Sequence, residues 1–269
     1  MKGIRMQGGI PLQGKVRIQG SKNAALPILA ATLLTNEVSY IQNCPRIADV
    51  HRFVHLLREL GCLVHWQEKG IRVQPGENEE LPCERAEARR MQGEAITGMR
   101  SSLCLLGALL GRCGYVTMEH PGGCVIGERP IDLHIRALQQ MGVEFREEEG
   151  LLSAQVKDGK MHGAEITLEF PSVGATENIL LAAVKADGDT RILGAAREPE
   201  VTALCEFLTA CGAQIEGIGG SELLVHGDRP LHSTRYTVPS DRIVAGTYLF
   251  ACICLLYTSP SPRDISGSR

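Results

Sequence analysis

The chain contains the stretch Leu57-Arg58-Glu59-Leu60-Gly61-Cys62-Leu63-Val64, and the same pattern occurs twice more. The counterparts are Leu138-Gln139-Gln140-Met141-Gly142-Val143-Glu144-Phe145 and Leu208-Thr209-Ala210-Cys211-Gly212-Ala213-Gln214-Ile215. In each copy an amphipathic run ends at a glycine, and a short β-rich run follows. Glycine just past the last turn often ends a helix, because it adopts positive φ angles freely. The pattern therefore predicts three copies of a helix that passes through a glycine into a strand.

Each copy also begins with a second, more apolar helix, expected over residues 23–34, 99–110 and 175–186. Small and aliphatic side chains nearly surround these helices, which predicts that they are buried. Between the two helices lie β-rich connectors such as Val38-Ser39-Tyr40-Ile41. The repeat is therefore a βαβαβ-type unit of about 70 to 80 residues in an α/β fold, and a fourth copy starts at Ser240 and stops short.

Composition limits the classes of function. The chain has 269 residues, 43% of them hydrophobic and 22% charged, which suffices for one large core or two smaller ones. A net charge of -3 argues against wholesale binding to nucleic acid or to an anionic membrane, so any anion site must be local. We see no signal peptide and no membrane-spanning stretch, and we expect a cytoplasmic protein.

Cysteine and histidine spacing gives no metal site. The ten cysteines include no C-x-x-C pair and are expected to be free thiols in a reducing compartment. His51 and His55 have the spacing of two ligands on one helix face, but no further ligand motif accompanies them. We therefore expect neither a metal nor an organic cofactor.

One loop carries a thiol, a guanidinium and a carboxylate between glycines: Pro121-Gly122-Gly123-Cys124-Val125-Ile126-Gly127-Glu128-Arg129-Pro130-Ile131-Asp132. The glycines give the loop the freedom to fold over a ligand and withdraw. Arg129 supplies a fixed cation that favours the thiolate of Cys124 and can bind an anion. The pattern indicates a catalytic loop, although a packed cysteine in an ordinary turn has the same spacing.

The apolar helices begin with residues suited to anions. Gly20-Ser21-Lys22-Asn23 places a lysine and an amide at a helix start, where free backbone N–H groups also favour negative charge. Arg100 has the same place in the second copy, and residues 171–176 offer hydroxyl and backbone donors in the third. A solvated lysine at a helix start is the alternative. Because corresponding helix starts of a repeat tend to face one side, we expect Lys22, Arg100 and Arg129 to converge.

Three motifs together resemble the UDP-N-acetylglucosamine 1-carboxyvinyltransferase family of the EPSP synthase superfamily. They are Ser-Lys-Asn-Ala-Ala-Leu-Pro at 21–27, Gly-Gly-Cys-Val-Ile-Gly-Glu-Arg-Pro-Ile-Asp-Leu-His at 122–134 and Ser-Val-Gly-Ala-Thr-Glu-Asn at 172–178. The resemblance covers residues 1 to about 252 and implies transfer of enolpyruvyl from phosphoenolpyruvate to the 3-hydroxyl of UDP-N-acetylglucosamine. Phosphate is released, in the first committed step of peptidoglycan synthesis.

The resemblance also implies roles for particular residues. Cys124 would be the general acid and the target of fosfomycin, and Lys22 and Asn23 would hold phosphoenolpyruvate. The nucleotide sugar and the reacting anions would be contacted by Arg100, Arg129, Pro130, Ile131, Asp132 and Leu133. The uridine diphosphate portion would touch Ser172, Val173 and Gly174. The family's catalytic aspartate lies in a portion that this chain does not contain, so we expect the fragment alone to be inactive.

The implied fold is an inside-out α/β barrel built from βαβαβ-type repeats, with one domain complete and the second truncated. Residues 22–239 would form the transferase domain, and residues 1–21 and 240–252 would be remnants of the second domain. Residues 253–269 are Ser/Pro-rich and resemble a translated sequencing adapter, so we expect a disordered artefact there. Two alternatives stay open: 3-phosphoshikimate 1-carboxyvinyltransferase, and a non-catalytic nucleotide-sugar-binding protein on the same fold.

Overall fold

The computed structural model describes residues 3, 5, 14–75, 90–120, 131–157 and 159–255. The chain divides into two compact units, one of residues 1–19 with 240–269 and one of residues 20–239. The first unit contains helix α8 (Arg242–Leu255), which begins at Asp241 because its Oδ1 accepts hydrogen bonds from the backbone N–H of Ile243 and Val244. Residues 253–255, expected to lie outside the fold, continue this helix.

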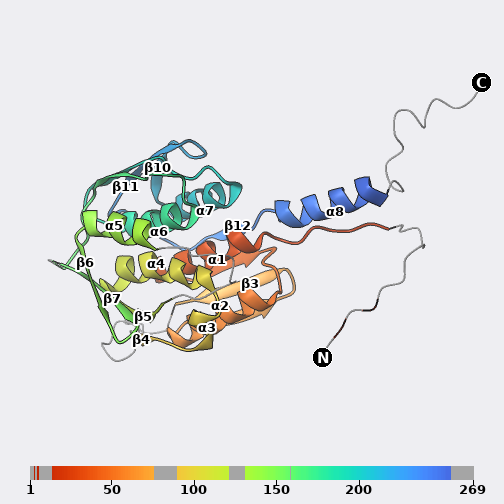
Figure 1. Ribbon diagram of the computed structural model, residues 1–269, viewed down its shortest axis with the longest axis horizontal. Coiled ribbons are helices and arrows are strands. Elements are labelled where there is room, and N and C mark those ends of the chain that lie inside the picture. Colours follow the sequence, from red (N-terminus) through yellow and green to blue (C-terminus); the bar gives the residue numbers. More distant parts are fainter. Residues whose placement is uncertain are drawn as a thin grey trace, which may run out of the picture. The chain divides into compact units, whose positions relative to one another are not determined.

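Three apolar helices begin the three copies of the repeat in the second unit (Figure 1). They are α1 (Lys22–Ala31), continued by the 3-10 turn η1 (Thr32–Leu34), then α4 (Cys104–Cys113), entered through the 3-10 turn η4 (Arg100–Leu103), and α6 (Val173–Ala183). Every α1 residue from Ala24 to Ala31 is buried, as are the α4 residues from Cys104 to Leu110 and the α6 residues from Ala175 to Ala183. The predicted burial of these helices is confirmed.

The second helix of each copy is amphipathic and ends as its sequence predicts. These helices are α2 (Ala48–Glu59), α5 (Asp132–Gln140) and α7 (Pro199–Ala210). Gly61, Gly142 and Gly212 follow them with φ angles of 92°, 88° and 104°. An L-residue side chain is strained in this left-handed region, so glycine is the residue that turns the chain out of the helix. The expected strands follow as β2 (Leu63–Gln67), β6 (Val143–Glu148) and β10 (Gln214–Glu216).

Each copy contributes to a four-stranded sheet, and the three sheets have the same strand pattern. Their orders are β12-β1-β3-β2, β4-β5-β7-β6 and β8-β9-β11-β10. The strands not yet given are β1 (Ser39–Gln42), β3 (Gly70–Gln74), β4 (Arg90–Met91), β5 (Tyr115–Glu119), β7 (Leu151–Val156), β8 (Glu165–Thr167), β9 (Asp189–Leu193), β11 (Glu222–His226) and β12 (Arg235–Thr237). In every sheet the first two strands are parallel, and the other neighbours are antiparallel.

The observed unit has one strand more than the expected βαβαβ pattern. The extra strands β3, β7 and β11 pair antiparallel with the strands that precede them. Between β6 and β7 the turn residues Glu149 and Gly150 have φ angles of 51° and 78°, the positive values typical of tight hairpins. A turn this short cannot carry a parallel crossover, so the added strand must be antiparallel.

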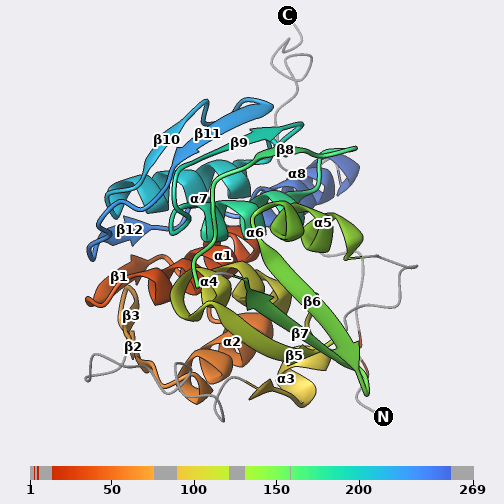
Figure 2. The same cartoon turned by 90° about the vertical axis from the view of Figure 1, so that its left-hand side faces the viewer.

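The first sheet is completed from a distant part of the sequence. β12 follows the third copy, yet it lies parallel to β1, with Tyr40 opposite Arg235. Figure 2 shows the three sheets on the outside of this unit, with α1, α4 and α6 between them. Helices α4 and α6 approach so closely that a Cβ on Gly107 would lie 2.3 Å from the backbone oxygen of Asn178. The core is therefore formed by helices whose starts are held in fixed relation to one another.

Candidate substrate pocket

A cavity of about 530 Å³ lies where the three apolar helices begin. Lys22 and Asn23 come from the first turn of α1, Arg100 from η4, and Val173 and Gly174 from the first turn of α6. The structure therefore brings together five of the residues singled out in the sequence. The first N–H groups of a helix have no partner within the helix, so the α1 and α6 starts add partial positive charge to that of the two cations. Such a cavity suits a negatively charged ligand.

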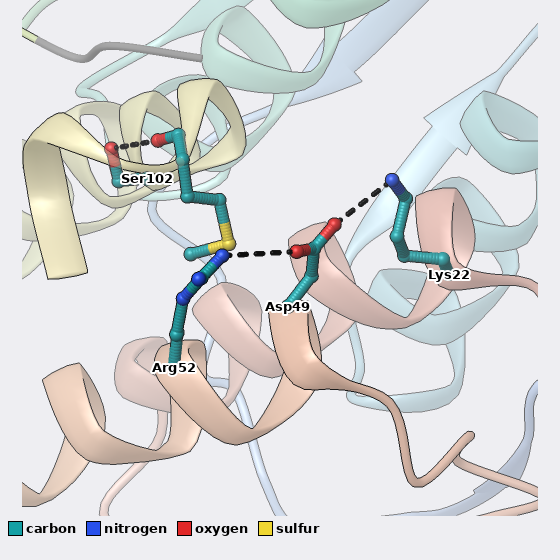
Figure 3. A network of polar contacts seen from close by, with 5 residues as sticks. Lys22, Asp49, Arg52 and Ser102 are labelled. Atoms are coloured by element: carbon teal, nitrogen blue, oxygen red, sulfur yellow. Dashed lines mark hydrogen bonds and ion pairs between the residues drawn. The ribbon is translucent and has the colours of Figure 1, made fainter. Parts of the chain in front are cut away.

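A carboxylate holds the side chain of Lys22 at the start of α1. Its Nζ lies 3.0 Å from Oδ2 of Asp49, and Arg52 Nη1 lies 3.6 Å from Oδ1 of the same residue. Figure 3 shows Asp49 between the two cations: Asp49 and Arg52 lie one turn apart on α2, and Lys22 lies at the start of α1. The side chain of Lys22 is 41% exposed. An ion pair this exposed is worth little in stability, so an incoming anion can compete for the lysine.

Local hydrogen bonds fix the backbone at the first two helix starts. Ser21 is the N-cap of α1, where its Oγ accepts a hydrogen bond of 3.3 Å from the Ala24 N–H. The buried Ser102 hydroxyl lies 2.6 Å from the Met99 carbonyl oxygen and 3.2 Å from that of Ile96, and it donates towards them. The hydroxyl contact of Ser102 is drawn in Figure 3. Both serines therefore hold the turns that present Lys22 and Arg100 to the cavity.

The third helix start is capped in the same manner. Ser172 is the N-cap of α6, and its Oγ accepts a hydrogen bond of 3.4 Å from the Ala175 N–H. Thr176 Oγ1 donates to the Ser172 carbonyl at 2.8 Å and accepts from the Ala196 N–H at 3.1 Å. Val173 and Gly174 line the cavity, whereas Ser172 acts from behind them as the cap.

A buried amide connects three helices behind the cavity. Asn178 Oδ1 accepts a hydrogen bond of 2.7 Å from the Gly107 N–H, and Nδ2 lies 3.0 Å from Nδ1 of His134 and 3.3 Å from the Gly174 carbonyl. The amide joins α6 to α4 and α5. Burial, and then the charge of Arg100, lower the pKa of His134 to about 4. His134 is thus a neutral imidazole at neutral pH, with Nδ1 as the acceptor for Asn178.

A buried carboxyl and a buried thiol meet at the same cavity. Cys104 Sγ lies 3.6 Å from Oε2 of Glu177, and both residues line the cavity. Oε1 of Glu177 is buried, and it has no hydrogen-bond partner among the described residues. Burial raises the pKa of Glu177 to about 8, and the nearby carboxylates of Glu200 and Glu198 add to the increase. Burial and Glu177 together raise the pKa of Cys104 well above its usual range, so this thiol is protonated.

The remaining predicted site residues divide into two groups. Cys124, Arg129 and Pro130 lie outside the described residues. The other three lie at the start of α5: Ile131 is the residue before the helix, Asp132 pairs with Arg136 at 3.7 Å, and Leu133 is buried. None of these three lines the cavity among the described residues, but His134 directly after them does.

Sequence reasoning missed several residues that line the cavity: Asp49, Cys104, His134, Glu177 and Asn178. Glu177 and Asn178 had a usable signal, because two adjacent polar residues interrupt an otherwise apolar helix that was expected to be buried. His134 closes the quoted cysteine-loop motif. Asp49 and Cys104 have no such signal, since only the packing of α2 and α4 against α1 and α6 brings them to the cavity.

Within the described ranges we find no group of three or more His, Cys, Asp or Glu side chains that could hold a metal ion. The same part of the chain has no helix long and apolar enough to cross a membrane. The eight cysteines described there are free thiols.

Comparison with protein families gives a match over nearly the whole chain. The family model for EPSP synthase (3-phosphoshikimate 1-carboxyvinyltransferase) matches residues 6–255. Among curated proteins, a UDP-N-acetylglucosamine 1-carboxyvinyltransferase of Oleidesulfovibrio alaskensis is 42% identical over 252 residues, which are 93% of this chain and 58% of that protein. A UDP-N-acetylglucosamine 1-carboxyvinyltransferase 2 of Caldanaerobacter subterraneus is 44% identical over 250 residues, which are 92% of this chain and 57% of that protein.

Solved structures give the same fold. The enolpyruvyl transferase NikO of Streptomyces tendae matches with a TM-score of 0.74 at 23% identity, over 91% of this chain and 56% of that one. An EPSP synthase of Acinetobacter baumannii matches with a TM-score of 0.65 at 18% identity, over 90% of this chain and 53% of that one. The chain thus spans less than two thirds of the length of the relatives that it matches.

Proposed function

Because the chain belongs to the EPSP synthase family, we propose that it carries the first part of an enolpyruvyl transferase that acts on UDP-N-acetylglucosamine. The observation that carries this proposal is the cavity in which Lys22, Arg100 and the start of α6 meet. The identities of 42% and 44% with relatives named for that reaction favour this acceptor. The reaction would begin the synthesis of peptidoglycan, and its phosphorylated substrates would place it in the cytoplasm.

The proposed chemistry is addition followed by elimination. A proton is added to the methylene carbon of phosphoenolpyruvate, and the neighbouring carbon gains oxocarbenium character. The 3-hydroxyl of the sugar attacks this carbon and loses its own proton. Phosphate then leaves with the electrons of its C–O bond as a methyl proton departs, which restores the double bond in the product. Charge builds up on the phosphate at the end, so nearby cations lower the barrier.

We assign the described residues to binding and orientation. Lys22 would exchange its contact with Asp49 for the phosphate or carboxylate of phosphoenolpyruvate, with Asn23 beside it. Arg100 would contact the reacting anions, and the N–H groups at Val173 and Gly174 would face the diphosphate of the nucleotide sugar.

Cys124 is proposed as the general acid that protonates the methylene carbon, and Arg129 as the cation that activates it. The segment from Pro130 to Leu133 would contact the nucleotide sugar.

The finer architecture is part of the same proposal. Three sheets surround three apolar helices, which supports an inside-out α/β barrel for residues 22–239. Residues 1–21 and 240–252 would belong to a second domain of the same kind. The apolar side chains of α8 support this, because Leu249, Phe250 and Ile253 are 63%, 70% and 67% exposed.

Binding measurements separate the proposed acceptor from its alternative. We would titrate the chain with UDP-N-acetylglucosamine and, separately, with shikimate 3-phosphate by isothermal titration calorimetry. The proposal predicts heat of binding with the nucleotide sugar and none with shikimate 3-phosphate. The reverse preference would assign the chain to the shikimate-pathway enzymes, and binding of the sugar by a protein whose Cys124 is inert would favour a non-catalytic binding protein.

The variant that tests the cavity is Lys22→Met, which keeps most of the side-chain length and removes the charge. We expect the affinity for phosphoenolpyruvate to fall about tenfold or more, because one charge-assisted contact to an anion is worth about 1.5–3 kcal/mol. The matched control is Lys157→Met, which removes an exposed lysine that pairs with Glu144 on the β6–β7 hairpin. An equal loss of affinity for phosphoenolpyruvate in both variants would mean that the cavity does not hold the anion.

A further inference from the structure

The structure holds a second acid in the cavity besides the proposed catalytic loop. Glu177 lies in α6 one turn beyond Val173 and is only 5% exposed. One carboxyl oxygen accepts a weak hydrogen bond from the Cys104 thiol, and the other has no partner in the part of the chain that the structure describes. Ordinary buried carboxylates are stabilised by cations or by several N–H donors. Within the described ranges Glu177 has neither kind of partner at its second oxygen, and so its environment favours the neutral acid.

Titratable groups of α4 and of the start of α7 act on Glu177. Cys104 faces it from α4, and the carboxylates of Glu198 and Glu200 act on it from the start of α7. Around the same cavity lie the titratable and charged side chains of α1, α2, η4 and α5, namely Lys22, Asp49, Arg100 and His134. His134 is neutral at neutral pH, and the two cations are those that we assign to the ligand. If Glu177 were ionised, it would be a third carboxylate beside those of Glu198 and Glu200. Its negative charge would lie at the cavity where an anion must bind.

We propose that Glu177 is a positioning residue that must be uncharged for a phosphate-bearing ligand to bind beside Lys22 and Arg100. The neutral carboxyl packs between the starts of α4 and α6 and keeps both at the cavity wall. The ionised carboxyl repels the ligand and draws water or a cation into the wall. This inference rests on the proposed function, because the ligand concerned is the same nucleotide sugar.

The proposal predicts a pH limit for binding. If the ionised form does not bind, the apparent affinity is reduced by the fraction of molecules that are ionised. With the pKa of Glu177 at about 8, the wild-type affinity for UDP-N-acetylglucosamine falls about tenfold between pH 7 and pH 9. Glu177→Gln keeps the shape of the side chain and stays neutral, so the affinity of this variant for UDP-N-acetylglucosamine changes by less than about twofold over that range.

The experiment is calorimetric titration of the chain with UDP-N-acetylglucosamine at pH 7 and pH 9. The matched control is Glu165→Gln, which neutralises an exposed glutamate of β8 and is expected to lose affinity as the wild type does. Parallel loss of affinity in wild type and Glu177→Gln, or a flat wild-type profile, would overturn this inference and leave the proposed function standing. No binding by the wild type at either pH would overturn both.

A second measurement needs no variant. At pH 8 about half of the free chain carries the Glu177 proton, so binding takes up about half a proton per ligand. Titrations in two buffers of different ionisation enthalpy measure that uptake directly. We expect net uptake at pH 8 and much less at pH 6. The absence of uptake at pH 8 would contradict the proposal even if Glu177→Gln failed to fold.

Discussion

A cavity lined in part by cations lies at each end of the three apolar helices, but the cations have different partners at the two ends. At the starts of α1, α4 and α6, the cavity of about 530 Å³ is lined by Lys22 and Arg100. At the opposite ends, a cavity of about 610 Å³ is lined by Arg112, Lys160 and Lys185. The second cavity is the larger and the richer in cations. Volume and charge alone would therefore favour the end opposite to the site that we propose.

Hydrogen bonds distinguish the two ends. Arg112 Nη1 donates to the carbonyl oxygens of Leu33 and Thr35 at 2.7 and 3.0 Å, and Nη2 donates to Asn36 Oδ1 at 2.9 Å. Helix C-termini have free carbonyls and partial negative charge, so cations there are bound by the fold itself. At the N-termini the helix charge is positive, and cations add to it. Lys22 and Arg100, beside helix starts, are thus placed to meet an anion, whereas Arg112, beside helix ends, is bound by the fold itself.

The closest approach of two central helices should give the largest effect on stability. Gly107→Ala would put a Cβ 2.3 Å from the backbone oxygen of Asn178, and backbone atoms of two packed helices cannot move apart cheaply. We expect a loss of about 3 kcal/mol in the free energy of unfolding, measured by urea denaturation.

Gly246→Ala in α8 is the matched control, because none of the described residues has an atom within 4 Å of the added one. It is expected to be neutral or stabilising, as alanine is favoured over glycine in a helix. Equal effects of the two substitutions would contradict the close packing of α4 and α6.

The neutral histidine at the helix starts should give a pH effect of the next size. The pKa of His134 is about 4 in the folded chain against its usual 6.5, so the unfolded chain binds more protons between these values. Stability is then fully present above pH 6.5 and is lost as pH falls towards 4. The variant His134→Gln keeps an acceptor for Asn178. As pH falls over that range, we expect its free energy of unfolding to decrease by about 2 kcal/mol less than that of the wild type.

Denaturation of both proteins at pH 6.5 and pH 4.5 measures this difference, and the changes common to both, from the many carboxylates, cancel. Parallel curves would show that His134 is not held neutral by its surroundings.

Sequence could predict this contrast only in part. The C′ glycines and the apolar helices are local signals, and Gly61, Gly142 and Gly212 have the backbone angles that their positions require. The gathering of Lys22 with Arg100 followed from the repeat. The pairing of β12 with β1 did not, since it joins segments almost 200 residues apart and no local pattern carries it. Asp49, the partner of Lys22, and Cys104, the partner of Glu177, were missed because no local pattern brings them to the cavity either. The proposed role of Cys124 stays a prediction.

At the far end, Arg112 should matter to stability and not to ligand binding. Arg112→Met removes the donors to Leu33, Thr35 and Asn36 and leaves those acceptors to water. We expect a loss of about 1–2 kcal/mol in the free energy of unfolding, with the affinity for UDP-N-acetylglucosamine unchanged.

Lys22→Met should show the opposite pattern, with little loss of stability and a large loss of ligand affinity. Denaturation and calorimetry on the same two variants test the contrast. If Arg112→Met weakened ligand binding as strongly as Lys22→Met, the contrast between the two helix ends would be wrong.

The smallest effect concerns the carboxylate that holds Lys22. Asp49→Asn removes a negative charge next to the cavity and releases the lysine from its 3.0 Å ion pair. We expect phosphoenolpyruvate to bind about two- to threefold more tightly, and more so at low salt, because exposed charges are screened. Weaker binding would mean instead that Asp49 orients Lys22 for the ligand.

Site-specific alkylation by fosfomycin tests the central claim most directly, namely that the cavity and the Cys124 loop form one anion-binding active site. Mass spectrometry would locate the adduct among the ten cysteines, in this chain and in one extended by the corresponding portion of the Oleidesulfovibrio alaskensis relative. We predict labelling of Cys124 in the extended chain, faster with UDP-N-acetylglucosamine and lost in Lys22→Met. Absence of labelling at Cys124, or labelling that neither the sugar nor Lys22 affects, would contradict the account.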